Sequence, residues 1–121
     1  MVISYDKNII SCASIEEYQR HLILAFSNLD DEIWISEYGK EDELPCIGIL
    51  INGQDAVINF FSEEINCVSV GNTNREDTIN FCNGGYSVCG YQIVSKDIAL
   101  KCAMDFYETK MCSQDIVWEE L

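Results

Sequence analysis

Two apolar runs separated by a turn sequence constrain the fold of this chain most. Residues 46–51 and 56–61 are rich in Ile, Val and Phe, and the dipeptide Asn52-Gly53 stands between them. Asn and Gly both tolerate a positive φ angle, which the tight turn of a β-hairpin requires. The sequence therefore predicts two adjacent antiparallel strands over these residues.

Further short extended segments surround this hairpin. Residues 32–38 place Ile33 and Ile35 on one face of a strand and Trp34 on the other. Additional strands are predicted over residues 66–70, 78–82 and 86–94, and a last extended piece over residues 115–118. Asn83-Gly84-Gly85 supplies a second turn.

A helix is predicted at each end of this run of strands. Ser14 and Glu17 have the spacing of a capping box, and an apolar stripe follows until the helix ends near Asn28. The stripe consists of Ile15, Tyr18, Leu22, Ala25, Phe26 and Leu29. The second helix spans residues 96–109 with Ser95 as its cap. Its buried face consists of Ala99, Leu100, Ala103, Phe106 and Tyr107.

These elements predict one α+β domain over residues 1–121. The chain is short for a single domain, it has one proline, and no Gly/Ser-rich stretch divides it. We expect an antiparallel meander sheet of about five to seven strands, with the N-terminal and C-terminal helices packed on one face. Trp118 is interpreted as a core residue between the final strand and the helix.

The charge balance is the strongest indication of function. The chain has 7 basic and 21 acidic residues, a net charge of −14 and a pI near 4.1. Such a surface repels nucleic acid and anionic membranes and attracts basic proteins. The longest aliphatic run, Cys46–Ile51, is far shorter than the ~20 residues that span a bilayer. No signal peptide precedes it, so we expect a cytoplasmic protein with no membrane and no nucleic-acid partner.

The acidic residues are concentrated in residues 30–64, which contain ten of them and only one basic residue, Lys40. One interpretation is that they are solvated loop residues that maintain solubility. The other is a negative face that steers a cationic protein into contact, with exposed Trp34 and Tyr38 as anchors. The candidate partner-binding residues are Asp30, Asp31, Glu32, Trp34, Glu37, Tyr38, Glu41, Asp42, Glu43, Glu63 and Glu64.

Signals for catalysis or for a cofactor are weak. The seven cysteines are scattered, and no pair has the spacing of a zinc knuckle, so we interpret them as small buried hydrophobic residues. A metal or disulfide role, or a nucleophilic pair of one cysteine with His21, remains an alternative. No phosphate-binding glycine loop and no nucleophile elbow is present. We expect a binding protein without a cofactor rather than an enzyme.

The C-terminal segment resembles a bacterial family of immunity proteins against polymorphic toxins, the first-numbered family of that class. The resemblance covers Ile98-Ala99-Leu100, Asp105 to Thr109 and Ile116-Val117-Trp118-Glu119. The hairpin over residues 49–60 and an early tryptophan, Trp34, are similar as well. Where family members carry a glycine and a proline before the tryptophan, this chain has Lys110-Met111-Cys112-Ser113-Gln114.

The resemblance implies a small cytoplasmic protein that binds one cognate toxin domain and blocks it. Such toxins are nucleases or nucleic-acid deaminases delivered by contact-dependent or other secretion systems, and their clefts are basic. The alternative that the residues leave open is an acidic adaptor domain that binds a protein without neutralising a toxin.

Overall fold

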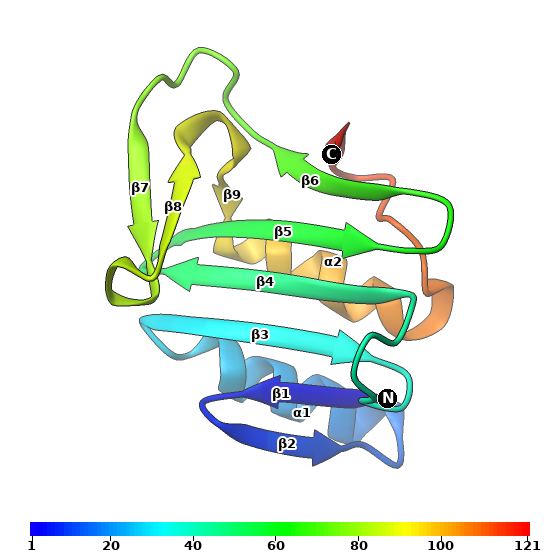
Figure 1. Ribbon diagram of the computed structural model, residues 1–121. Helices are drawn as coiled ribbons and strands as arrows, with labels where there is room; N and C mark the ends of the chain where they lie inside the picture. Colours follow the sequence, from blue (N-terminus) through cyan, green and yellow to red (C-terminus); the bar gives the residue numbers. More distant parts are fainter.

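A sheet of eight antiparallel strands forms one layer of the structure, and two helices form the other (Figure 1). The computed structural model describes residues 1–121. The strand order is β10-β6-β5-β4-β3-β1-β2, with β9 paired to β5, and β7 and β8 form a separate hairpin. The strands of the sheet are β1 (Val2–Tyr5), β2 (Asn8–Ser11), β3 (Asp30–Ser36), β4 (Cys46–Asn52), β5 (Asp55–Phe61), β6 (Asn66–Val70), β9 (Val94–Ser95) and β10 (Val117–Glu120). The α+β class is confirmed, and the sheet has one strand more than expected.

Both helices form where their caps predict. In α1 (Ile15–Phe26), the Ser14 side chain accepts a hydrogen bond from the Glu17 amide, and the Glu17 carboxylate accepts one from Ala13. In α2 (Lys96–Thr109), Ser95 accepts from the Ile98 amide. The bounds of α2 are those predicted, whereas α1 ends two residues earlier than Asn28.

The core lies between the helices and the sheet. On β3 the side chains of Ile33 and Ile35 point into it, as predicted from their alternation with Trp34. The Tyr18 hydroxyl donates a 2.6 Å hydrogen bond to the Ala103 carbonyl and joins the two helices. The expectation that Leu29 belongs to the buried stripe is wrong: α1 has ended, and Leu29 is 77% exposed.

Several strand boundaries differ from those predicted. β3 begins at Asp30 and ends at Ser36, so Glu37 and Tyr38 lie in the loop that follows it. In the β4–β5 hairpin, Asn52 still pairs with Asp55, so Gly53-Gln54 forms the turn, with Gly53 at a φ of 62°. The last strand begins at residue 117, two residues later than predicted.

Residues 86–94 are not one strand. They divide into β8 (Tyr86–Cys89), a short 3-10 helix (Gly90–Gln92) and the start of β9. The Gly90 amide donates to the Asp77 carbonyl, and the Ile93 amide donates to the Gly90 carbonyl. The first bond extends the pairing with β7 (Thr78–Phe81) by one residue, and the second closes the turn that leads into β9, which pairs with β5.

The N-terminal hairpin of β1 and β2 was not predicted. Its two turn residues, Asp6 and Lys7, have φ angles of 47° and 62°. Lysine rarely marks such a turn, so the sequence carries little signal for it. The hairpin matters for the site because β1 pairs with β3 and extends the sheet beyond Trp34.

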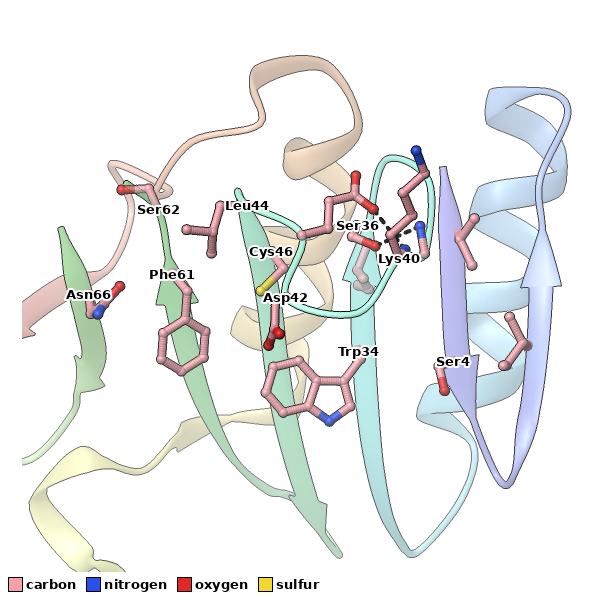
Figure 2. Close-up of a pocket in the computed structure, with 15 residues that line it drawn as sticks. Ser4, Trp34, Ser36, Lys40, Asp42, Leu44, Cys46, Phe61, Ser62 and Asn66 are labelled. Carbon is pink, nitrogen blue, oxygen red and sulfur yellow. Dashed lines mark hydrogen bonds between the residues drawn. The ribbon is translucent and has the colours of Figure 1, made fainter. Parts of the chain in front are cut away.

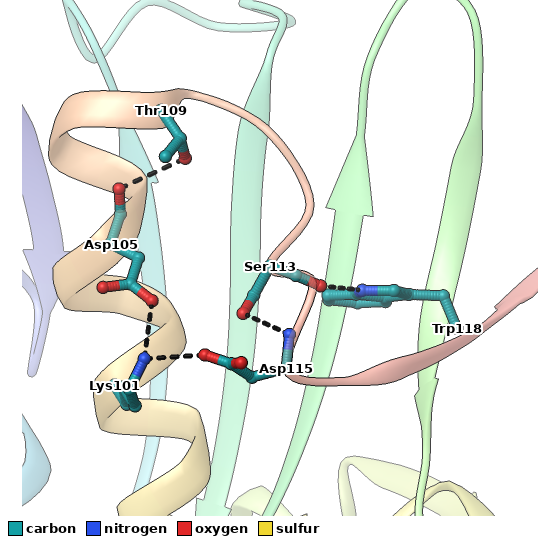
Figure 3. Close-up of polar contacts among 6 residues, drawn as sticks. All are labelled: Lys101, Asp105, Thr109, Ser113, Asp115 and Trp118. Atoms are coloured by element: carbon teal, nitrogen blue, oxygen red, sulfur yellow. Dashed lines mark hydrogen bonds and ion pairs between the residues drawn. The ribbon is translucent and has the colours of Figure 1, made fainter.

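The C-terminal segment is tied to α2 and to the core (Figure 3). Lys101 forms ion pairs with Asp105 at 3.1 Å and with Asp115 at 2.7 Å. The Trp118 indole donates to the Ser113 carbonyl at 2.8 Å, and its ring packs on the core 6.5 Å from that of Phe60. The interpretation of Trp118 as a packing residue is therefore confirmed, although the side chain is half-buried at the margin of the core.

The seven cysteines are all free thiols, and no group of three or more ligating side chains is placed to hold a metal ion. The interpretation of the cysteines as buried residues holds for Cys12, Cys67 and Cys102 only. The other four are not buried: Cys46, Cys82 and Cys112 are half-buried, and Cys89 is exposed. Burial raises the pKa of Cys102 to about 12. The His21 ring lies 3.5 Å from the Tyr5 hydroxyl. Neither helix has the length and apolar composition needed to cross a bilayer.

The sheet face opposite the helices is only half covered. Here Leu50 and Val57 form a small second core with Phe81, Val88 and Ile93, beneath the β7–β8 hairpin. That hairpin covers one end of the face (Figure 1). At the other end Trp34, Gly48 and Phe61 are not part of this core. We call this helix-free face of the sheet the open face. Its side chains include Glu32 and Trp34 of β3, Gly48 of β4 and Phe61 of β5.

Candidate protein-binding face

The floor of the open face is a tryptophan lying flat on a glycine. Trp34 of β3 pairs directly with Gly48 of β4. A Cβ atom at Gly48 would come within 2.8 Å of two carbons of the indole ring, so only glycine leaves room for it. The ring extends over β4 to Phe61 of β5, with 6.1 Å between ring centroids and 20° between planes. Trp34 keeps 41% of its surface exposed.

A groove of about 510 Å³ lies above this floor (Figure 2). Residues 37–45, the loop from β3 to β4, form one wall, and the beginning of β1 contributes Val2 and Ser4. We call it the Trp34 groove. Its other polar lining groups include Ser36, Ser62 and Asn66. An apolar floor with a few polar groups at the rim is typical of a binding site.

Glu43 holds the 37–45 loop in shape. Its carboxylate accepts hydrogen bonds from the amides of Tyr38 at 2.9 Å and Lys40 at 3.0 Å. Ser36 also accepts from the Gly39 amide at 2.9 Å. Partial burial opposes ionisation of Glu43, but these amide hydrogen bonds outweigh it and hold the pKa of Glu43 below its usual range.

We expect acidification to loosen this loop. Because the pKa of Glu43 is lowered in the folded protein, its contribution is present above the ordinary glutamate pKa and is lost as pH falls through the lowered value. Backbone amide signals of residues 38–40 in an NMR pH titration should report the change. Glu43→Gln should show a loosened loop already at neutral pH, with a weaker response to acid. If the variant and the parent titrate alike, Glu43 does not hold the loop.

An acidic cleft lies at the other end of Trp34, and internal hydrogen bonds hold its carboxylates. Asp30 accepts from the amides of Cys82 and Asn83 at 2.8 and 3.0 Å, and so fixes the β7–β8 turn. Asp31 accepts from the side chain of Asn28 at 2.8 Å. Glu32 accepts from the Trp34 indole at 2.8 Å and the Tyr86 hydroxyl at 3.0 Å. The hydrogen bond to Glu32 raises the pKa of Tyr86.

A third concave region, a hollow, lies on the opposite side of the 37–45 loop from the Trp34 groove. It has a volume of about 460 Å³ and is lined by Glu63 and Glu64 together with Leu44 and Ile65. Lys110 also lines it and forms a 2.9 Å ion pair with Glu37. We call it the Ile65 hollow. Leu44 and Ile65 are 44% and 37% exposed, which gives this hollow an apolar side.

The three concave regions adjoin one another. Trp34 lines both the acidic cleft and the Trp34 groove, and Leu44 lines both the groove and the Ile65 hollow. Of the predicted residues, Asp30, Asp31, Glu32 and Trp34 line the cleft; Trp34, Asp42 and Glu43 the groove; and Glu63 and Glu64 the hollow. Glu37, Tyr38 and Glu41 lie in the loop between groove and hollow. The structure thus brings the predicted residues into adjoining regions, although the Ile65 hollow is also lined by Phe60, Met111 and Cys112, which lie towards the end of α2 and not on the open face.

The acidic residues of this surface are not equivalent. The carboxylates of Asp30, Asp31, Glu32, Glu37 and Glu43 all have partners within the protein. Glu41, Asp42, Glu63 and Glu64 are exposed and form no hydrogen bond or ion pair. These four carboxylates are therefore free to pair with a cation from another molecule.

Sequence reasoning missed the apolar half of the site. Phe61, Leu44, Ile65 and Gly48 were not proposed as site residues, although each shapes a groove or a hollow. A signal existed for Phe61, because it alternates with buried Phe60 on β5 and must point to the opposite face. No local sequence signal indicates that the Trp34 ring packs on Gly48.

No family model matches the chain, and no curated protein matches its sequence.

Proposed function

We propose that this chain is an immunity protein that binds and neutralises a cognate toxin domain in the cytoplasm. The toxin would be a nuclease or nucleic-acid deaminase with a basic cleft. One observation carries the proposal: three adjoining concave regions share Trp34 and Leu44 as lining residues, with an aromatic floor on the open face and unpaired carboxylates around it. The resemblance of residues 98–119 to an immunity-protein family supports it from the sequence.

The proposed mechanism is occlusion. An enzyme that acts on nucleic acid lines its cleft with Lys and Arg to hold phosphates, and a net charge of −14 complements such a cleft. Glu41, Asp42, Glu63 and Glu64 steer the approach, since no internal partner satisfies them. Trp34 and Tyr38 supply buried area at the centre, where aromatic residues dominate binding energy.

Growth rescue tests the proposal. The toxin domain encoded beside this chain, expressed in sensitive cells, should arrest growth, and co-expression of this chain should restore it. The purified pair should bind one to one, and association should slow by ~10–1000-fold as salt screens the steering charges. One-to-one binding without protection would assign the open face to an adaptor domain instead. Neither binding nor protection would contradict both functions.

Two variants with the same change in charge locate the interface. The first neutralises the unpaired acids of the 37–45 loop and the Ile65 hollow, and the second neutralises exposed acids elsewhere, each replacement being Glu→Gln or Asp→Asn. The first variant changes Glu41, Asp42, Glu63 and Glu64; the second changes Glu16, Glu76, Glu108 and Glu120. Association should slow much more in the first. Equal slowing in both would mean that net charge, and not this face, directs binding.

A further inference from the structure

Asp42 is a charged group of the Trp34 groove without a partner. It lies in the 37–45 loop with a φ of 59°, is exposed, and forms no hydrogen bond or ion pair. In Figure 2 its carboxylate points from the loop towards the Trp34 ring, and both side chains line the same cavity. The groove therefore presents a negative charge beside an exposed aromatic face.

The other charged groups of the groove are already engaged. The Glu43 carboxylate binds the amides of its own loop. The Lys40 ammonium lies 5.7 Å from the centre of the Tyr38 ring. Asp42 thus remains the unpaired charge of this groove, and its complement must come from outside the chain.

We propose that the Trp34 groove receives an arginine side chain from the bound protein, with the guanidinium stacked on the Trp34 indole and paired with the Asp42 carboxylate. The inference rests on the proposed function in that the toxin domain supplies this arginine. It adds to that function a particular residue type at a particular place, which general charge complementarity does not specify.

The shape of the groove favours arginine over lysine. The indole lies with one face against Gly48, so its other face is available, and its N–H is fixed by Glu32. A planar guanidinium stacks on such a face and at the same time donates two hydrogen bonds to a carboxylate. The ammonium of lysine is a strongly hydrated point charge that can do only one of these well. A volume of about 510 Å³ accommodates the whole side chain.

Peptide binding to the isolated protein tests the inference without any toxin. The probes are blocked tetra-arginine and tetra-lysine peptides, which have equal charge. NMR signals of the two indole N–H groups report binding, because Trp34 lies in the groove and Trp118 lies half-buried against the core, outside the groove. We expect the arginine peptide to shift the Trp34 signal, to leave Trp118 unchanged, and to bind about fivefold or more tightly than the lysine peptide.

Asp42→Asn and Glu41→Gln form a matched pair. Each removes one charge from the same loop, but only Asp42 lines the groove, and asparagine tolerates the positive φ at position 42. Asp42→Asn should remove most of the preference for arginine, and Glu41→Gln should weaken both peptides equally and slightly. Trp34→Leu, with folding checked by its melting temperature, should abolish the preference as well.

Two results would overturn the inference: equal binding of both peptides with the same shift of Trp34, or equal losses in the two loop variants. Because the titration needs no toxin, it fails or succeeds independently of growth rescue. Rescue without arginine preference removes only the groove assignment. Arginine preference without rescue retains the groove and removes the toxin as its source.

Discussion

Phe60→Ala should lower the free energy of unfolding by about 3–5 kcal/mol, whereas Phe61→Ala should cost about 1 kcal/mol. The two residues are adjacent on β5 but lie on opposite faces of the sheet. Phe60 is 4% exposed, and its ring lies 6.4 Å from that of Phe106 and 6.5 Å from that of Trp118. Its removal leaves a cavity where α2 and β10 meet the sheet. Phe61 is half-buried and lies in the Trp34 groove, where water replaces it.

Urea unfolding of the two variants measures this difference. The shift of the midpoint at constant slope gives the change in stability, and an unchanged slope shows that the cooperative unit is the same. Equal destabilisation by both variants would mean that the open face is packed like a core, which would argue against its being a binding surface. Phe61→Ala should instead weaken binding of the arginine peptide, because it removes part of the aromatic floor.

Gly71→Ala should be the most damaging change of a single methyl group, at about 3 kcal/mol. Gly71 follows β6 and passes close to the segment that joins β8 to β9: its amide donates to the Tyr91 carbonyl at 2.6 Å. An added Cβ would lie 1.8 Å from the Ile93 carbonyl oxygen, which is backbone and cannot rotate away. The two segments would have to separate, and both that hydrogen bond and the nearby one from Ser69 to Gln92 would weaken.

Gly85→Ala is the matched control. Gly85 has a φ of −67°, which any residue adopts, and its added Cβ would lie 3.2 Å from the Cys82 carbonyl oxygen. This substitution should cost about 1 kcal/mol or less. Thermal unfolding of the two variants against the parent compares them directly. If Gly71→Ala unfolds at the temperature of the parent, the close approach of these backbones does not exist in solution.

Elements whose signals are local were predictable from the chain. The caps at Ser14 and Ser95 and the 3.6-residue stripes behind them predicted both helices, and the bounds of α2 are those observed. The alternation in β3 correctly placed Ile33 inside and Trp34 outside. These predictions succeed because capping bonds and side-chain periodicity depend only on residues within one or two turns of each other. The turn between β1 and β2 could not be predicted in this way, because its two residues, Asp6 and Lys7, carry little signal for a turn.

The candidate site was predictable only in part. Its acidic residues were recognisable because charge is a property of composition, and a cluster in residues 30–64 can be counted along the chain. Which of these carboxylates are unpaired was not recognisable, because the donors that bind Asp30 and Glu32 come from the distant β7–β8 hairpin. Trp34, Gly48 and Phe61 likewise meet only through the pairing of β3 with β4 and of β4 with β5. Charge and periodicity are written in the local sequence, but a binding surface requires strands from different parts of the chain to be aligned in register, and that alignment exists only in the folded sheet.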